Sequence, residues 1–265
     1  MGRIIMSNKI LIPTFVEAKL FENLEINGVE KALRECYGAK CEPVYMPQLV
    51  DARISAPNDS PVWQWHATPS VRVTGRTKPS TSTVKGGNPV VVYAHVPNYF
   101  SKPNNVAKAV SEGLTNGAGR MPPKEFYTLL SLEDNEKVFV VDYTTLKNSS
   151  SKVIDVAQAL EHPQVIPFLG GQTRTEQYLE KFQQVYNSTK IGVWHCDDLT
   201  DEPLGRVLFL GYDHSDDLIA NDYLSNSGRF LGVRRGVGVG SVARENPGLD
   251  AVMKSVKSAL EPMYR

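Results

Sequence analysis

Three short runs of apolar, mostly β-branched residues constrain the fold of this chain more than any other feature. They cover residues 90–95, 138–142 and 191–195. A run of this length and composition is typical of a strand with both faces covered, and such strands occur mainly in parallel sheets. Helix-like patterns occupy the chain between the runs, which favours crossover connections between parallel strands.

Helix signals appear on both sides of these runs. Asn27 with Glu30, and Thr173 with Glu176, have the spacing of a capping box before apolar residues at helical intervals. Pro122 is typical of a first helical turn. The same spacing of apolar residues predicts three further helices, over residues 104–114, 151–160 and 249–260.

The last third of the chain follows a different pattern. Residues 206–212 form an apolar run that follows His195 too closely for a crossover helix, so an antiparallel return is expected. Residues 229–235 would then pair with that strand. The sequence therefore predicts an α/β fold. Its mixed sheet has a mainly parallel centre of three crossover-linked strands, an antiparallel C-terminal hairpin and helices on both faces.

The chain of 265 residues is expected to form a single α/β domain, 1–265, with an irregular segment inside it. Six prolines interrupt residues 47–89, which predicts a Pro-rich insertion that acts as a flap or a small subdomain. This segment contains Trp63, Trp65 and His66. Two interpretations stay open for these large side chains, a local satellite core under a long loop and a lid over a ligand.

Charge and cysteine usage exclude several classes of protein. Lys and Arg together number 29 and so do Asp and Glu, and this zero balance disfavours broad nucleic-acid binding. No apolar run approaches the roughly 20 residues of a spanning helix, so no membrane association is expected. The three cysteines, Cys36, Cys41 and Cys196, are typical of a reduced, cytoplasmic protein. The oligomeric state is left open.

Each of the three apolar runs ends at or beside ionisable residues. If the strands are parallel, their carboxyl ends meet at one edge of the sheet, where α/β proteins bind ligands. His95, Asp142, His195 and Asp197 are then candidate catalytic acids and bases. His95, His195 and Asp198 could hold a divalent metal as cofactor. The alternative is that these strand ends simply face solvent.

A glycine-rich run near the C-terminus supplies a candidate anion site. Glycines let the backbone approach an anion closely, and arginine supplies a fixed positive charge. The returning hairpin would bring this run near Asp197 and Asp198, whereas residues 213–217 are expected to form a solvated loop. The candidate substrate-binding residues are Arg234, Arg235, Gly236, Gly238, Gly240 and Ser241.

Three functional hypotheses follow from these patterns. The first is an enzyme, a hydrolase or transferase that acts on a small polar molecule that could carry a phosphate. The second is a non-catalytic module that binds RNA or another polyanion through residues 229–241. That segment resembles the glycine-rich loop of CRISPR-associated RAMP proteins, which implies RNA binding. The third is a structural or assembly protein. The neutral net charge favours the enzyme and a small-molecule ligand.

Overall fold

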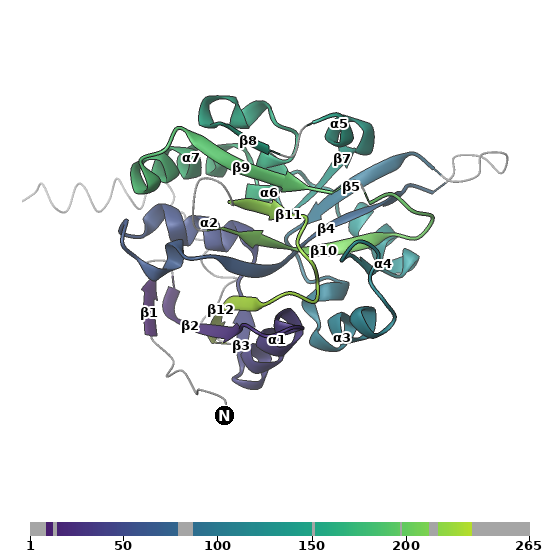
Figure 1. Ribbon diagram of the computed structural model, residues 1–265, viewed down its shortest axis with the longest axis horizontal. Coiled ribbons are helices and arrows are strands. Elements are labelled where there is room, and N and C mark those ends of the chain that lie inside the picture. Colours follow the sequence, from purple (N-terminus) through teal and green to yellow (C-terminus); the bar gives the residue numbers. More distant parts are fainter. Residues whose placement is uncertain are drawn as a thin grey trace, which may run out of the picture.

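Two β-sheets organise the molecule, a large one through its middle and a small one beside it (Figure 1). The computed structural model describes residues 9–12, 15–78, 87–149, 152–196, 198–211 and 217–234. The strands are β1 (Lys9–Ile12), β2 (Phe15–Asn23), β3 (Cys41–Pro43), β4 (His66–Arg76), β5 (Pro89–Ala94), β6 (Gly119–Arg120), β7 (Val138–Asp142), β8 (Lys152–Asp155), β9 (Lys190–His195), β10 (Leu204–Leu210), β11 (Leu218–Ala220) and β12 (Gly228–Arg234). The α-helices are α1 (Gly28–Gly38), α2 (Met46–Ser55), α3 (Pro103–Ser111), α4 (Pro123–Leu130), α5 (Tyr143–Asn148), α6 (Val165–Leu169) and α7 (Gln172–Tyr186).

The large sheet is mostly antiparallel. Its strand order is β7-β5-β4-β10-β11-β9-β8, with β6 paired to β10 outside this path. Among the described pairs of this sheet, β11 with β9 is parallel, and the others are antiparallel. The prediction of a mainly parallel centre is therefore wrong. An apolar β-branched run indicates that both faces of a strand are covered, but it carries no information about the direction of the neighbouring strand.

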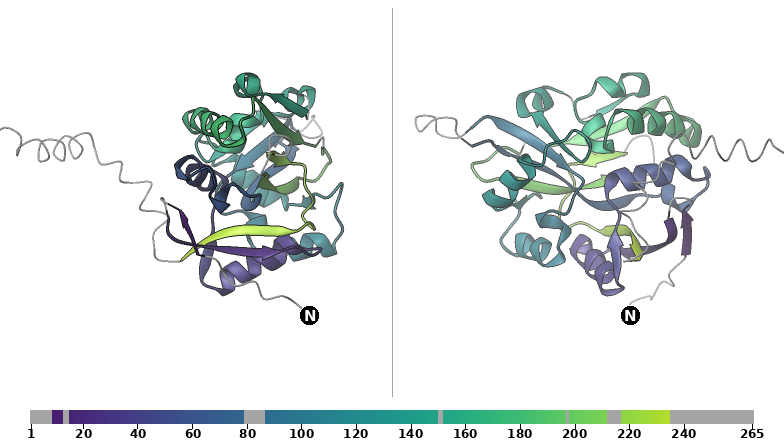
Figure 2. Two further views of the ribbon diagram at one scale, coloured as in Figure 1. Left: turned by 60° about the vertical axis from the view of Figure 1, so that its left-hand side comes forward. Right: turned by 180° about the vertical axis from the view of Figure 1, so that it is seen from behind.

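Strand β5 shows why its sequence is continuously apolar. Val91 and Tyr93 belong to one core cluster, and Val90 and Val92 belong to the other. Side chains alternate between the two faces of a strand, so each cluster lies on its own face of the sheet. Residues of α2, α6 and α7 fill the first cluster, and residues of α1, α3 and α4 fill the second. Figure 2 shows helices on both sides of the large sheet.

The predicted antiparallel C-terminal hairpin is also wrong. Strand β11 separates β9 from β10, so the expected pairing between residues 191–195 and 206–212 does not form. Strand β12 leaves the large sheet altogether and pairs with β2 and β3 in the small sheet, whose order is β1-β2-β12-β3. In this pairing, Phe230 of β12 lies opposite Phe21 of β2, although the two residues are far apart in the sequence. Loop lengths predict contacts between nearby segments and say nothing about such distant pairs.

The segment expected to be an irregular insertion, residues 47–89, contains most of α2 and the whole of β4. Strand β4 lies between β5 and β10 in the large sheet and is buried along nearly all its length. The register against β10 shifts between Val207, opposite Val71, and Leu208, opposite Thr68. Pro69 thus lies in a bulge, where its missing N–H removes no ladder hydrogen bond. Pro69 therefore marks a bulge within a regular strand rather than an absence of regular structure.

Some of the predicted helices are present in the structure and one is not. The signals at Asn27, Pro122 and Thr173, and the pattern over 104–114, lie at α1, α4, α7 and α3. The two predicted capping boxes are wrong, because the Asn27 side chain makes no cap hydrogen bond and Thr173 lies inside α7, whose N-cap is Gly171. The helix predicted over 151–160 is wrong, because the β-branched residues there form β8, followed by the short 3-10 helix Val156–Glu161. The helix predicted over 249–260 lies outside the described residues. Among the helices that are described, none has the length and apolarity needed to cross a membrane.

The start of α1 packs directly against the start of β12. A Cβ atom on Gly28 would lie 2.1 Å from the Asn23 carbonyl oxygen and 2.6 Å from the Gly228 nitrogen. These neighbours are backbone atoms, which cannot rotate away as a side chain can. The contact therefore requires glycine at position 28 and joins the first helix to the small sheet.

We expect Gly28→Ala to lower the free energy of unfolding by about 2–3 kcal/mol, the cost of overpacking a close contact. Urea unfolding followed by circular dichroism measures this. The matched control is Gly38→Ala at the other end of α1, where a Cβ meets nothing within 4 Å. Because alanine is the better helix former, that variant should be neutral or slightly more stable. Equal stability of the two variants would contradict the prediction.

Candidate functional site

The antiparallel pairing of β5 and β7 separates two of the predicted catalytic residues. Asp142 at the end of β7 lies opposite Val90 at the start of β5. His95 follows the other end of β5, where its backbone N–H donates to the Lys137 carbonyl at 2.8 Å. The two side chains therefore lie at opposite edges of the sheet, and the structure does not bring them together.

His95 is a buried structural residue with both ring nitrogens occupied. Its Nε2 lies 2.8 Å from the Pro167 carbonyl oxygen and its Nδ1 lies 3.0 Å from Ser70 Oγ. Since a carbonyl can only accept, Nε2 carries the proton and Nδ1 accepts from the Ser70 hydroxyl. Burial, the largest effect, lowers the pKa of His95 to about 4. A neutral His95 thus ties the end of β5 to α6.

Asp142 has a local role. Its carboxylate accepts from the Thr145 backbone N–H at 2.8 Å and from the Thr145 hydroxyl at 3.2 Å. This is the N-cap interaction of α5, which satisfies one of the unpaired N–H groups at the start of that helix. Asp142 is exposed and acts as a helix cap.

The remaining members of the predicted metal and catalytic set also lie apart from a common centre. His195 ends β9 beside His162, with ring centroids 6.0 Å apart. Asp198 is buried and accepts from Arg206 Nε at 2.8 Å, with Arg72 at 4.0 Å. Within the described residues, no group of three or more His, Cys, Asp or Glu could hold a metal ion, so the predicted metal site is a wrong hypothesis for this part of the chain. Asp197 lies outside the described residues.

Of the predicted anion-binding residues, Arg234 is exposed at the end of β12, where it pairs with Cys41 of β3. The strand that carries it is hydrogen-bonded on both edges, to β2 and to β3. The others lie outside the described residues: Arg235, Gly236, Gly238, Gly240 and Ser241.

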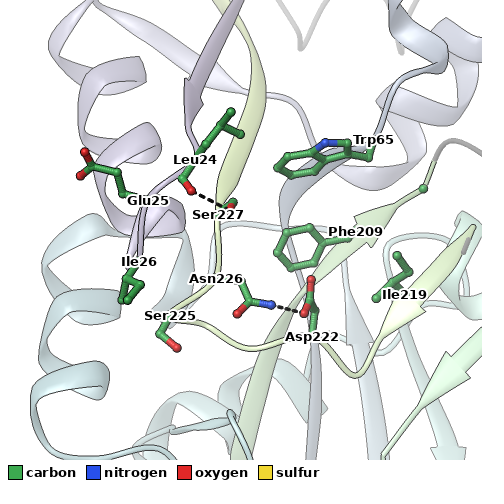
Figure 3. Close-up of a pocket in the computed structure, with 11 residues that line it drawn as sticks. Leu24, Glu25, Ile26, Trp65, Phe209, Ile219, Asp222, Ser225, Asn226 and Ser227 are labelled. Atoms are coloured by element: carbon green, nitrogen blue, oxygen red, sulfur yellow. Dashed lines mark hydrogen bonds between the residues drawn. The ribbon is translucent and has the colours of Figure 1, made fainter. Parts of the chain in front are cut away.

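A pocket of about 380 Å³ lies between the small and large sheets, and none of the described site residues predicted above lines it (Figure 3). Trp65 and Phe209 lie on one side, and the loop from β2 to α1 lies on the other. The segment between β11 and β12 closes the remaining side. The lining residues are Leu24, Glu25, Ile26, Trp65, Phe209, Gly211, Ile219, Asp222, Ser225, Asn226 and Ser227.

Aromatic rings form one wall of this pocket. The Trp65 and Phe209 rings lie 6.4 Å apart at an interplanar angle of 33°. The Arg229 guanidinium lies 5.3 Å from the Trp65 ring centroid, and its Nε donates to Glu22 at 2.6 Å. This cation–π contact and ion pair hold the indole in place. The wall is therefore a fixed apolar surface open to the pocket.

Polar groups lie beside this aromatic wall. Asn226 Nδ2 donates to the Asp222 carboxylate, and the two side chains meet below Phe209 in Figure 3. Across the pocket, Glu25 pairs with Lys31 at 2.7 Å. The hydrogen bond from Lys31, followed by its charge, lowers the pKa of Glu25, so this carboxylate stays ionised at neutral pH. The polar side of the pocket thus combines carboxylates, an amide and serine hydroxyls.

A buried arginine holds the loop that carries Asp222. Arg206 NH1 donates to the carbonyls of Asn221 at 3.1 Å and Asp222 at 3.0 Å, and NH2 donates to Asn116. Arg206 Nε also donates to the Asp198 carboxylate, and Arg206 is 1% exposed. Charge-assisted bonds of this kind position main chain without using the side chains that face the pocket.

A second buried arginine holds the segments around Trp65 and Gly211. Arg53 NH2 donates to the Gln64 carbonyl at 2.7 Å and to the Gly211 carbonyl at 2.6 Å. Arg53 NH1 reaches Asp217 at 3.4 Å, just before β11. One fully buried guanidinium thus joins the segments preceding β4, following β10 and preceding β11.

Main-chain bonds from α1 fix the third side of the pocket. The backbone N–H of Asn27 donates to the Ser225 carbonyl at 2.6 Å, and that of Val29 donates to the Asn226 carbonyl at 3.1 Å. These donors belong to the start of a helix, where N–H groups lack partners within the helix. The backbone of each of these pocket segments is therefore bound by groups that lie outside the pocket lining.

Sequence reasoning identified only one part of this site. The cluster of Trp63, Trp65 and His66 was open to interpretation as a lid, and Trp65 does line the pocket. Trp63 and His66 instead are buried, with Trp63 in a main core cluster. The exposed apolar pair Leu24 and Ile26, between a strand and a helix signal, was the missed clue to the opposite wall.

One solved structure identifies the relatives of this chain. It is described as "Accommodation of massive sequence variation in Nanoarchaeota by the C-type lectin fold", and that chain is 51% identical to this one. The match covers 82% of this chain and 97% of the other, with a TM-score of 0.74. No protein-family model and no curated protein matches this chain.

This similarity overturns the hypothesis of a hydrolase or transferase built on a parallel sheet. A C-type lectin fold with an antiparallel sheet has no common edge at which His95, Asp142 and His195 would meet. The resemblance of residues 229–241 to a glycine-rich RNA-binding loop stays a prediction, because residues 235–241 lie outside the described part of the chain.

Proposed function

This chain belongs to the same family as the nanoarchaeal C-type lectin fold protein, and we propose that it is a non-catalytic ligand-binding module. The ligand occupies the pocket between the β2–α1 loop, Trp65 and the segment Asp222–Ser227. A pocket of about 380 Å³ accepts one sugar ring or one large side chain, at the small end of ligand sites. The hydrogen bonds of Arg53, Arg206 and α1 to the pocket segments explain how such a site retains its shape.

The observation that carries this proposal is that groups outside the pocket lining hold the backbone of the pocket segments. Arg53, Arg206 and the first N–H groups of α1 bind the main chain of the pocket segments. Among the lining side chains, Asn226 donates to the Asp222 carboxylate and Ser227 donates to the Leu24 carbonyl, and these bonds add to that support. The related protein is described as accommodating massive sequence variation, and a scaffold of this kind supports exchange of pocket side chains here too.

The structural roles of the predicted catalytic residues also support binding over catalysis. His95 uses both ring nitrogens within the fold, and Asp142 caps a helix. The polar side chains that line the pocket are two carboxylates, an amide and hydroxyls beside two aromatic rings. Such a set recognises a ligand by stacking and hydrogen bonds.

Binding screens of the whole protein against a glycan array and a random peptide library test the proposal. We expect any specific ligand to bind Trp65→Ala and Asp222→Ala at least tenfold more weakly, because both side chains line the pocket. The control is Leu132→Ser, which changes an exposed apolar side chain elsewhere. Ligands that bind all three variants like wild type would show that the pocket is not the binding site.

A further inference from the structure

Exposed apolar side chains concentrate around this pocket. Leu24 is 62% exposed and Ile26 is 78% exposed, and both line it. Tyr223, 50% exposed, does not line the pocket, and its ring centroid lies 6.0 Å from the Arg206 guanidinium. In the described part of the chain, the other large hydrophobic residues that are exposed are Leu132 and Val153. Clustered exposure of this kind, unlike a single exposed leucine, marks an interaction surface.

We infer that the natural ligand is a polypeptide that inserts a large apolar side chain against Trp65 and Phe209, with a Lys or Arg of the partner beside it. This inference rests on the proposed function and names the partner class of the same pocket. The apolar anchor would also cover Leu24 and Ile26, which stand at the pocket's opposite wall.

The aliphatic wall favours a polypeptide over a saccharide. A sugar ring can stack on Trp65 and bond to Asp222 and Asn226, but it offers mainly hydroxyl groups to Leu24 and Ile26. Burial of aliphatic surface contributes about 25 cal/mol per Å² only against an apolar partner. The pocket volume suits one inserted anchor residue, and protein interfaces commonly centre on such anchors in pockets.

Charge complementarity specifies the neighbour of the anchor. Glu25, whose side chain is 76% exposed, and Asp222 place carboxylates on two sides of the pocket. Lys31 pairs with Glu25 at the surface, and exposed ion pairs of this kind are weak enough to exchange partners. Arg229 is turned toward Glu22 and the back of Trp65. A cationic residue of the partner therefore meets carboxylates at this rim.

Parallel selection from a random peptide library and a glycan array tests the inference. The whole protein is compared with the double variant Leu24→Ser/Ile26→Ser and with the control Leu132→Ser. We expect peptides with an apolar residue next to Lys or Arg to be enriched on wild type. Their affinity should fall at least tenfold on the double variant and stay unchanged on the control.

The outcomes separate the inference from the proposed function. A glycan that needs Trp65 but binds the double variant normally would overturn the polypeptide partner and keep the pocket as binding site. Enrichment of no peptide would overturn the polypeptide partner as well. Peptides whose affinity for Trp65→Ala and for the double variant equals that for wild type would overturn both the polypeptide partner and the pocket as binding site.

Discussion

Replacing Arg53 by methionine should lower the free energy of unfolding by about 3–5 kcal/mol, the cost of breaking a buried ion pair. The guanidinium is fully buried and donates to the carbonyls of Val62, Gln64, Leu210 and Gly211. Methionine removes these bonds and leaves the Asp217 carboxylate, itself 0% exposed, without its cation. Urea unfolding followed by tryptophan fluorescence measures the loss.

The double variant Arg53→Met/Asp217→Asn separates charge from hydrogen bonding. If the buried carboxylate causes much of the loss, neutralising it should restore about 1–2 kcal/mol. Tyr178 donates to Asp217 at 2.9 Å, and this bond can be retained by the asparagine carbonyl. A single variant within about 1 kcal/mol of wild type, typical of a surface substitution, would refute the central role of Arg53.

Acidification from pH 7 to pH 4 should strongly destabilise the protein through two buried histidines. Burial, followed by the charge of Arg53, lowers the pKa of His66 to about 3. Burial lowers the pKa of His95 to about 4. Both side chains are neutral in the folded state but take up a proton on unfolding below their ordinary pKa of about 6.5. Their contribution is therefore complete above pH 7 and is lost as the pH falls.

Each histidine should add a slope of about 1.4 kcal/mol per pH unit between pH 6 and pH 4. Urea unfolding at several pH values measures the slope, which the two groups together should bring to about 2.7 kcal/mol per pH unit. His95→Gln serves as the matched variant. It removes one of the two protons taken up on unfolding and should therefore reduce the slope by about 1.4 kcal/mol per pH unit. A free energy of unfolding that stays constant between pH 7 and pH 5 would contradict the buried, neutral state of both residues.

Local patterns predicted the elements better than their arrangement. The apolar run at 90–95 is a strand covered on both faces, and Pro122 lies at the start of α4, whereas Thr173 lies inside α7 and does not cap it. The error over 151–160 arose because β-branched residues at helical spacing also suit a short strand. The Pro-rich segment 47–89 was expected to be irregular, but it contains the whole of β4, in which Pro69 lies in a bulge.

The site could not be predicted because its parts come from five separate segments. Glu25, Trp65, Phe209, Asp222 and Asn226 share no motif or spacing in the sequence. The polar ends of strands that suggested an active site are individually explained by a helix cap, a buried histidine and an ion pair. A polar residue after a strand is a local feature, and its partner depends on which strands are neighbours.

The sequence by itself determined several of the regular segments and many of the buried apolar side chains, because propensity and periodicity act over a few residues. The tertiary structure alone decided that β5 and β7 are antiparallel, that β12 joins β2, and that Arg53 and Arg206 bind the pocket segments. These pairings depend on faces that fit together across long stretches of chain. Such complementarity exists only once the chain has folded, and it created the pocket.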